Sequence, residues 1–266
     1  MGGKAGDRLM QAAFAASCAA LGLYFVALLV AGAAFYEPAR AGAVAASAEF
    51  RAALWLSLWT ATLATVLAVL VALPVGWFLS RVAFPGKVVV DALLDLPTVL
   101  SPIATGTLLL MLFHTGCGRW LQAHGLTFVY TRAGVVLAQA TIVVALAVRL
   151  LKATFDAIPL RYEQLARVLG CSRFQAFRRV ALPLARPGLL AAVVICWARA
   201  FGEYGATVTL AGAMPLRTET VPVGIQLALA TVDLAGAVVL IGVLVGGALA
   251  VLVALRLLAR TGEVPR

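Results

Sequence analysis

Six apolar stretches dominate this sequence, and each approaches the length of a helix that crosses a lipid bilayer. Such a helix needs about 20 consecutive apolar residues. Charged residues make up 12% of the chain and apolar residues 63%, whereas about a quarter of the residues in a soluble domain are charged. We therefore expect an all-α membrane protein with six transmembrane helices in a single domain over residues 9–258. The predicted spans cover residues 9–36, 53–80, 96–113, 133–151, 187–211 and 234–255.

The first stretch predicts a membrane helix that is retained in the protein. No charged residue occurs between positions 9 and 36. The apolar core of a secretory signal peptide is only about 7–15 residues long. We therefore interpret residues 9–36 as a first span that is not cleaved.

The basic residues indicate how the chain is oriented. Most of the 21 Lys and Arg residues fall in segments that share a side of the membrane with the N-terminus. Those expected on the opposite side are Arg40, Arg51, Arg119, Arg132 and Arg217. Cytoplasmic loops are enriched in Lys and Arg, so we expect both termini to be cytoplasmic. The same rule accounts for the net charge of +10 without a nucleic-acid partner.

The sequence carries no pattern of a catalytic or metal site. The four cysteines form no CxxC pair, and His114 and His124 lie in one predicted loop without an acidic neighbour. The two Gly-Lys pairs are followed by Ala5 and Val88, whereas a phosphate-binding P-loop has Ser or Thr there. We therefore expect no metal, no cofactor and no ATP hydrolysis by this chain.

The predicted cytoplasmic connection over residues 152–186 is too patterned for a plain linker. Residues 160–169 predict a short helix, and Gly170 can supply the left-handed turn that ends it. Ser172 is suited to cap a second helix over residues 173–182. The sequence therefore predicts a helix, a tight turn and a second helix in this loop.

The second predicted helix is amphipathic. Phe174, Phe177 and Ala181 repeat along one face. The remaining surface is basic, through Arg173, Arg178 and Arg179. Basic amphipathic helices lie on anionic lipid or dock into a groove of a partner protein, and the periodicity alone leaves both alternatives open.

This loop resembles that of a known family. The EAA loop of ABC importer permeases is similar to the run Gln164-Leu-Ala-Arg-Val-Leu-Gly170, followed after nine residues by Val180-Ala-Leu-Pro183. The family pattern has Glu-Ala-Ala, three residues, Gly, nine residues, Ile, one residue and Leu-Pro. This chain departs from it at Gln164, Leu165 and Val180, and Glu163, one residue earlier, can supply the missing charge.

The resemblance implies a type I ABC importer permease whose loop over residues 152–186 couples to a cytoplasmic ATPase. It implies that Phe174 and Phe177 pack into a cleft of that ATPase. The implied partners are two ATP-binding subunits, an extracytoplasmic binding protein and a second copy of the chain, in the cell membrane of a prokaryote. The implied coupling residues are Glu163, Gln164, Ala166, Gly170, Phe174, Phe177, Leu182 and Pro183.

A second stretch, residues 197–212, is similar to a segment of molybdate, tungstate and sulfate permeases, in which an Arg, a Gly-Glu pair and an Ala-Gly end recur at this spacing. Residues 217–222 and Asp233 also resemble the molybdate branch, whereas Ala213 replaces its usual Asn. The likeness implies that the substrate is an oxyanion, with molybdate as the first candidate. It also implies an extracytoplasmic protein that binds this oxyanion. Since that binding protein can set selectivity, tungstate and sulfate stay open as alternatives.

Arg199 and Glu203 place two charges inside the fifth predicted span. They are four residues apart, so they share a helix face and can pair. Each charge at the centre of a membrane helix costs about 2.5–3.5 kcal/mol, so we expect them to pair or to face a wet cavity. The pair either locks the bundle or a gate, or lets Arg199 contact the passing oxyanion. Thr207 and Thr209, with the nearby glycines, allow a break that lines this pathway.

A secondary transporter driven by an ion gradient is an alternative of another class. Such a protein carries acidic residues inside several spans, whereas Glu203 is the only acidic residue well inside one here. An intramembrane enzyme needs a nucleophile with a base or a set of metal ligands, and neither histidine is placed for that. The sequence therefore favours a permease that depends on a separate ATPase.

Overall fold

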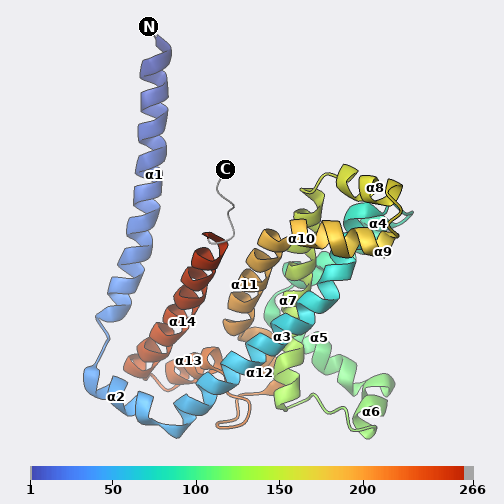
Figure 1. Cartoon of the computed structure of the whole chain (residues 1–266). Helices are drawn as coiled ribbons and strands as arrows, with labels where there is room; N and C mark the ends of the chain where they lie inside the picture. Colours follow the sequence, from blue (N-terminus) through green and yellow to red (C-terminus); the bar gives the residue numbers. More distant parts are fainter. Residues whose placement is uncertain (1, 261–266) are drawn as a thin grey trace.

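The prediction of an all-α protein is confirmed (Figure 1). The computed structural model describes residues 2–260, and no strand occurs among them. The helices are α1 Gly2–Ala33, α2 Pro38–Ala46, α3 Ala48–Arg81, α4 Lys87–Val99, α5 Pro102–His114, α6 Gly116–Ala123, α7 Arg132–Asp156, α8 Arg161–Val168, α9 Arg173–Ala176, the π-helical turn η1 Phe177–Ala181, α10 Leu182–Leu184, α11 Arg186–Phe201, α12 Gly205–Ala211, α13 Val221–Ala230 and α14 Leu234–Arg260.

Length and composition allow up to six of these units to cross a membrane. Two pairs of helices qualify only together and are bent, α4 with α5 by 109° and the segment Arg173–Leu184 with α11 by 72°. Counting each bent pair as one span gives six. The single helices that qualify are Met10–Ala33, Ala48–Arg81, Arg132–Asp156 and Leu234–Val251.

The third predicted stretch, residues 96–113, is not one straight helix. Its first residues end α4, and the backbone is extended at Leu100 and Ser101. Pro102 forces extended backbone on the residue before it, and the Ser101 hydroxyl caps α5 by accepting from the Ala104 N–H at 3.2 Å. The chain therefore turns sharply, and the straight apolar segment begins at Pro102.

Small residues bring α3 and α7 together at the centre of the bundle. Ala64, Ala68, Ala72 and Gly76 recur every four residues on α3 and are buried. A Cβ on Gly76 would lie 3.0–3.3 Å from the backbone of Leu151 and its neighbour on α7. Small residues at this spacing let membrane helices approach closely. The result is a closely packed pair of helices that runs between the two ends of the bundle.

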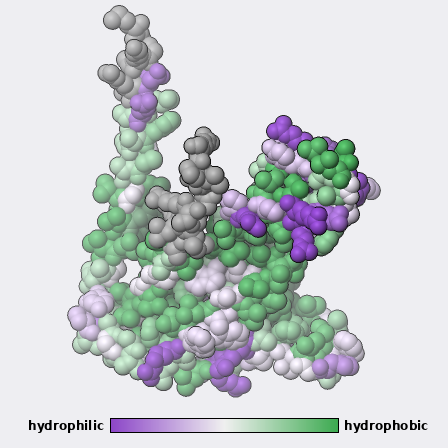
Figure 2. Space-filling model, in the orientation of Figure 1, coloured by the Kyte–Doolittle hydropathy of each residue, from purple (hydrophilic) through white to green (hydrophobic). Residues whose placement is uncertain are grey.

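Hydrophilic side chains gather at both ends of this bundle (Figure 2). One end carries the loop over residues 152–186 and is called the loop end below; α8, α9 and α10 project there (Figure 1). The opposite end carries α2, α6 and the turn between α12 and α13. Between them the surface is largely apolar, as expected for a lipid-facing belt.

The first helix, α1, stands apart from the rest of the chain (Figure 1). None of its Met10–Ala33 segment is buried against the other helices. Phe14, Leu23 and Val30 are among its exposed apolar side chains. The helix therefore depends on lipid or on another protein to cover its surface.

Candidate functional site

The predicted turn in the loop is confirmed. Gly170 has φ +92°, in the left-handed region, which glycine adopts without a steric cost. Ser172 then caps α9: its hydroxyl accepts from the Gln175 N–H at 3.2 Å, and the Gln175 side chain accepts from the Ser172 N–H at 2.8 Å. This capping box and the glycine turn fix α8 against α9.

The second helix of the loop differs from the prediction of one α-helix over residues 173–182. Only Arg173–Ala176 is α-helical, and the chain then widens into η1 before α10 begins. Pro183 has no N–H to donate to the carbonyl of residue 179. A π-turn is a usual way for the backbone to accommodate such an interruption. The loop therefore meets α11 through a kink at Ala185 instead of a continuous helix.

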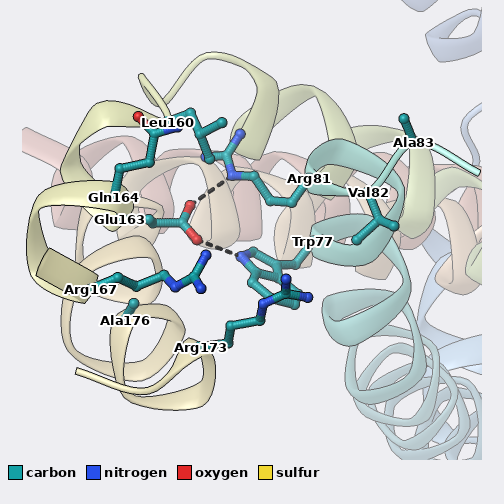
Figure 3. Close-up of a pocket in the computed structure, with 10 residues that line it drawn as sticks. All are labelled: Trp77, Arg81, Val82, Ala83, Leu160, Glu163, Gln164, Arg167, Arg173 and Ala176. Carbon is teal, nitrogen blue, oxygen red and sulfur yellow. Dashed lines mark hydrogen bonds and ion pairs between the residues drawn. The ribbon is translucent and has the colours of Figure 1, made fainter. Parts of the chain in front are cut away.

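Glu163 anchors the loop to the end of α3 (Figure 3). One carboxylate oxygen accepts from Arg81 Nε at 2.7 Å, and the other accepts from Trp77 Nε1 at 3.1 Å. The ion pair is buried, with side-chain exposures of 8% for Arg81 and 6% for Glu163. Arg81 also donates to the Ile158 carbonyl at 3.0 Å. The loop is thereby tied at two points to α3.

The buried carboxylate of the loop is that of Glu163, one residue before the position at which the resembling motif has Glu. Gln164 lies on the exposed side of α8, and Ala166 is half-buried on the same helix. Sequence reasoning missed Trp77 and Arg81 as partners of Glu163. Their signal was a Trp and an Arg four residues apart at the last turns of the second span, since such residues share a helix face.

The two loop phenylalanines face different surroundings. The Phe177 ring packs inside this chain, with its centroid 5.2 Å from that of Trp77 and 6.2 Å from that of Phe155. Phe174 is 68% exposed. Phe177 is half-buried, so the apolar end of α3 already covers part of its ring. That both rings pack into a cleft of a partner stays a prediction. Leu182 and Pro183 are half-buried where the loop joins α11.

An exposed apolar ridge crosses the loop, and sequence reasoning recognised only part of it. Three aliphatic side chains of α8 and the turn after it are more than half exposed and join Phe174. We call this set the loop ridge; its members are Leu165, Val168, Leu169 and Phe174. Val168 and Leu169 lie directly before the Gly170 turn, whose geometry carries them outward.

Arg199 and Glu203 form the predicted contact within the fifth stretch. Arg199 NH1 lies 2.5 Å from Glu203 Oε2. The other Glu203 oxygen accepts from the Ala206 N–H at 3.0 Å, so Glu203 also caps α12. Its side chain is 1% exposed, whereas that of Arg199 is 37% exposed. The pair therefore joins the end of α11 to the start of α12.

The break at this pair is fixed by close helix packing. The chain leaves α11 at Gly202 and re-enters a helix at Gly205. A Cβ on Gly106 of α5 would lie 2.8 Å from the Ala206 Cα. The Thr209 hydroxyl donates a hydrogen bond to the Gly205 carbonyl at 2.8 Å. The short α12 is therefore held tightly against α5.

Several polar side chains in the interior of the bundle are buried without a hydrogen-bond partner within the part of the chain described. Thr207 is fully buried, and its hydroxyl has no hydrogen-bond partner within the part of the chain described. The same holds for the Gln139 amide on α7 and the Thr220 hydroxyl before α13. Neither of these two residues carried a sequence signal, because an isolated polar residue in an apolar run has no periodicity. Of the two threonines predicted to line the pathway, Thr207 is buried and Thr209 is half-buried.

The end of the bundle opposite the loop has its own ion pair. Arg40 of α2 pairs with Asp233, which also accepts from the Gly236 N–H at 2.9 Å and so caps α14. The hydrogen bond from Arg40 is the largest cause that holds the pKa of Asp233 below its ordinary value, followed by the backbone N–H of Gly236. Asp233, which the sequence linked to the molybdate branch, thus joins α2 to α14.

Known proteins resemble this chain in sequence and in fold. The family of binding-protein-dependent transport system inner membrane components matches residues 64–262. The molybdenum transport system permease protein ModB of Escherichia coli (strain K12) is 38% identical over 175 residues, which are 62% of this chain and 76% of that protein. The sulfate transport system permease protein CysT of the same organism is 32% identical over 203 residues, 76% of this chain and 73% of that protein.

The fold has a counterpart among solved structures. A bacterial ABC transporter involved in the import of the acidic polysaccharide alginate matches with a TM-score of 0.77, at 15% identity and over 97% of both chains. This likeness concerns the fold, while the sequence relatives confirm the resemblance to importer permeases of the molybdate and sulfate branch. Since the family match covers most of its length, this chain belongs to the binding-protein-dependent transport system inner membrane components.

Proposed function

We propose that the chain is the transmembrane permease subunit of an ATP-driven importer for an oxyanion, with molybdate as the first candidate. The loop over residues 152–186 passes the motion of a separate ATPase to the spans. The observation that carries this proposal is the buried anchor of Glu163 on Arg81 and Trp77. A loop tied to a membrane helix by an ion pair and a hydrogen bond moves together with that helix.

The loop ridge is the surface that this proposal assigns to the ATPase. Its four apolar side chains are exposed at the tip of the loop end, with Arg178 and Arg179 exposed nearby. A helix-in-groove contact uses apolar anchors of this kind surrounded by charges. The alternative, in which the loop lies on anionic lipid, uses the same residues and predicts no dependence on a partner protein.

The assembly that we propose is a homodimer with two ATPase subunits and an extracytoplasmic oxyanion-binding protein. The family description as binding-protein-dependent supports the last partner. The loop end faces the cytoplasm in this arrangement, and so do both termini, in the prokaryotic inner membrane. ATP closes the ATPase dimer, draws the two loops together and opens the pathway outward, and hydrolysis resets it. The change of state requires that the ATPase contact the loop differently in its two forms.

Arg199 and Glu203 have a locking role in this proposal. Glu203 uses both oxygens inside the chain, on Arg199 and on the N-terminus of α12. An anion that passed nearby would meet only the exposed part of Arg199. The pair therefore holds α11 to α12 beside the pathway, with substrate contact left to Arg199.

Uptake by reconstituted vesicles tests the function directly. The vesicles contain this chain, its ATPase and its binding protein, with ATP inside the compartment that the ATPase faces. We expect uptake of radiolabelled molybdate that stops when ATP is omitted, and no uptake of sugars or amino acids. Sulfate uptake in preference to molybdate would transfer the proposal to the sulfate branch, which the CysT relative supports. Uptake driven by an ion gradient without ATP would instead support a secondary transporter.

A further inference from the structure

A small cavity opens at the loop end between α3 and the coupling loop (Figure 3). Its volume is about 260 Å³, far above the roughly 15 Å³ that a single water needs. Glu163 and Trp77 form its inner side, and other side chains of α8 and α9 form its outer side. The lining residues are Trp77, Arg81, Val82, Ala83, Leu160, Glu163, Gln164, Arg167, Arg173 and Ala176.

Two arginines converge on this cavity from different helices. Arg167 comes from the last turn of α8 and Arg173 from the first residue of α9, and both point inward in Figure 3. The left-handed turn at Gly170 and the capping box of Ser172 bring them to one cavity. Both side chains are also exposed to solvent, so an ion from solution can reach them. Two like charges in one cavity repel each other, and a bound counter-ion would lower that repulsion.

The acidic group of the cavity is already in use. Both oxygens of Glu163 are engaged, one by Arg81 and one by Trp77. The other nitrogens of Arg81 donate to the Ser80 hydroxyl and to the Ile158 carbonyl. Within residues 2–260, neither Arg167 nor Arg173 has a salt bridge to an acidic side chain. The cavity therefore carries two positive charges in excess.

We propose that this cavity binds a small tetrahedral oxyanion with two negative charges, of the class of phosphate, sulfate and molybdate. Guanidinium groups bind such anions through pairs of parallel N–H donors, and two of them from different helices match a dianion. The recess between three elements favours a compact ion over a flat protein surface. The bound ion bridges α8 and α9 beside the Glu163 anchor, away from the Arg199–Glu203 pair. This inference goes beyond the importer proposal and does not depend on it.

Titration calorimetry with inorganic phosphate tests the site on the full chain in nanodiscs of neutral lipid, at constant ionic strength. We expect one phosphate per chain. R167Q and R173Q should each weaken binding by about tenfold or more, because each removes one of two charge-assisted donor groups. R178Q and R179Q are the matched controls: these arginines are exposed on the same loop but do not line the cavity. They should change the affinity less than about twofold, since exposed charges act weakly at a distance.

Further variants and conditions distinguish a specific anion site from a diffuse basic surface, a partner protein and a lipid headgroup. R167K and R173K keep the charge but lose the paired donors, so we expect intermediate losses. Equal losses in all four arginine variants would reduce the effect to a diffuse basic surface and overturn the site. Absence of any phosphate binding at millimolar concentration would also overturn the site. If R173Q then weakened co-purification with the ATPase, the arginines would instead be assigned to a carboxylate of that partner. Adding phosphatidic acid to the nanodisc should leave the phosphate isotherm unchanged. If the added lipid abolished phosphate binding, the cavity would be assigned to a lipid headgroup, and the free-ion proposal would be overturned.

Discussion

Arg81 Nε donates to Glu163 Oε1 at 2.7 Å across 82 positions of sequence, and both side chains are buried. This ion pair is the link between a membrane-spanning helix and the loop that we propose as the handle of the ATPase. Trp77, one turn before Arg81 on α3, completes the link from the other oxygen. The loop is therefore connected to α3 and, through the close packing of α3, to α7.

E163Q tests this link. The substitution keeps the size of the side chain and leaves the Arg81 guanidinium buried without its counter-charge. Removing one partner of a buried ion pair destabilises a protein by about 3–5 kcal/mol, so we expect a clear drop in the thermal unfolding midpoint in detergent. In vesicles, more ATP should be hydrolysed per molybdate transported.

The double variant R81Q–E163Q is the control for the charge effect. It removes both charges, so it should recover much of the stability that E163Q loses, while the coupling defect should persist. W77F removes one hydrogen bond, worth about 1 kcal/mol, and part of the ring that packs on Phe177. It leaves no buried charge without a partner, so it should have a smaller effect on stability than E163Q. Wild-type stability and wild-type coupling in E163Q would show that the anchor is dispensable.

G170V tests the turn between α8 and α9. A residue with a Cβ in the left-handed conformation costs roughly 1–2 kcal/mol, and a β-branched side chain adds to this. No atom lies within 4 Å of the missing Cβ, so the effect comes from the backbone alone. We expect reduced co-purification with the ATPase and reduced ATP-driven uptake, with the spans intact by circular dichroism.

Gly116 supplies the matched control for this turn. It also has open space around its missing Cβ, but it lies in α6 without a left-handed backbone. G116A should leave uptake unchanged. A G170V protein that transports as well as G116A would argue strongly against a mechanical role of the turn.

G76V tests the packing of α3 on α7. The added Cβ would lie 3.0 Å from the Lys152 backbone nitrogen, and a helix backbone cannot move aside cheaply. Overpacking of this kind costs about 1–3 kcal/mol, so we expect a lower unfolding midpoint in detergent. G22A, on α1 where nothing lies within 4 Å, should leave the midpoint unchanged. An unchanged midpoint in G76V would contradict the close α3–α7 contact.

D233N tests the ion pair at the opposite end. Arg40 lowers the pKa of Asp233, so the pair adds stability above the ordinary carboxyl pKa, and this stability is lost as the pH falls through the lowered pKa. We therefore expect D233N to unfold more readily than the wild type at pH 7. The difference should shrink at a pH well below about 4, where the wild-type carboxyl becomes protonated. Unfolding curves of both proteins against pH measure this, and a constant difference would contradict it.

The spans and the loop motifs could be read from the sequence because each rests on local pattern. Apolar length marks the spans, and Gly170 and Ser172 have local conformational preferences that need no tertiary partner. The bend before Pro102 was less accessible, since a proline permits either a kink or a new helix. The packing of Phe177 inside the chain could not be predicted from the sequence. Its periodicity places it beside Phe174 on one face, and only the packing of Trp77 and Phe155 decides that it turns inward.

The same limit applies to the charges. The i, i+4 spacing was enough to predict the pair of Arg199 and Glu203, because one helix holds both residues. The pair of Arg81 and Glu163 joins residues from two distant segments, and no spacing rule connects them. The sequence suggested that Glu163 supplies a charge, but its partner depends on how the loop folds back over α3.

F174A and F177A separate docking from folding within one short segment. Phe174 is exposed on the loop ridge, and surface substitutions usually change stability by no more than about 0.5 kcal/mol. F174A should therefore keep the unfolding midpoint but weaken co-purification with the ATPase. Phe177 packs against Trp77 and Phe155, and truncating such a ring costs several kcal/mol in a full core, so F177A should lower the midpoint clearly. If F174A bound the ATPase as the wild type does while vesicles still transported molybdate, the loop ridge would not be the docking surface, because its largest exposed side chain would contribute nothing to the contact.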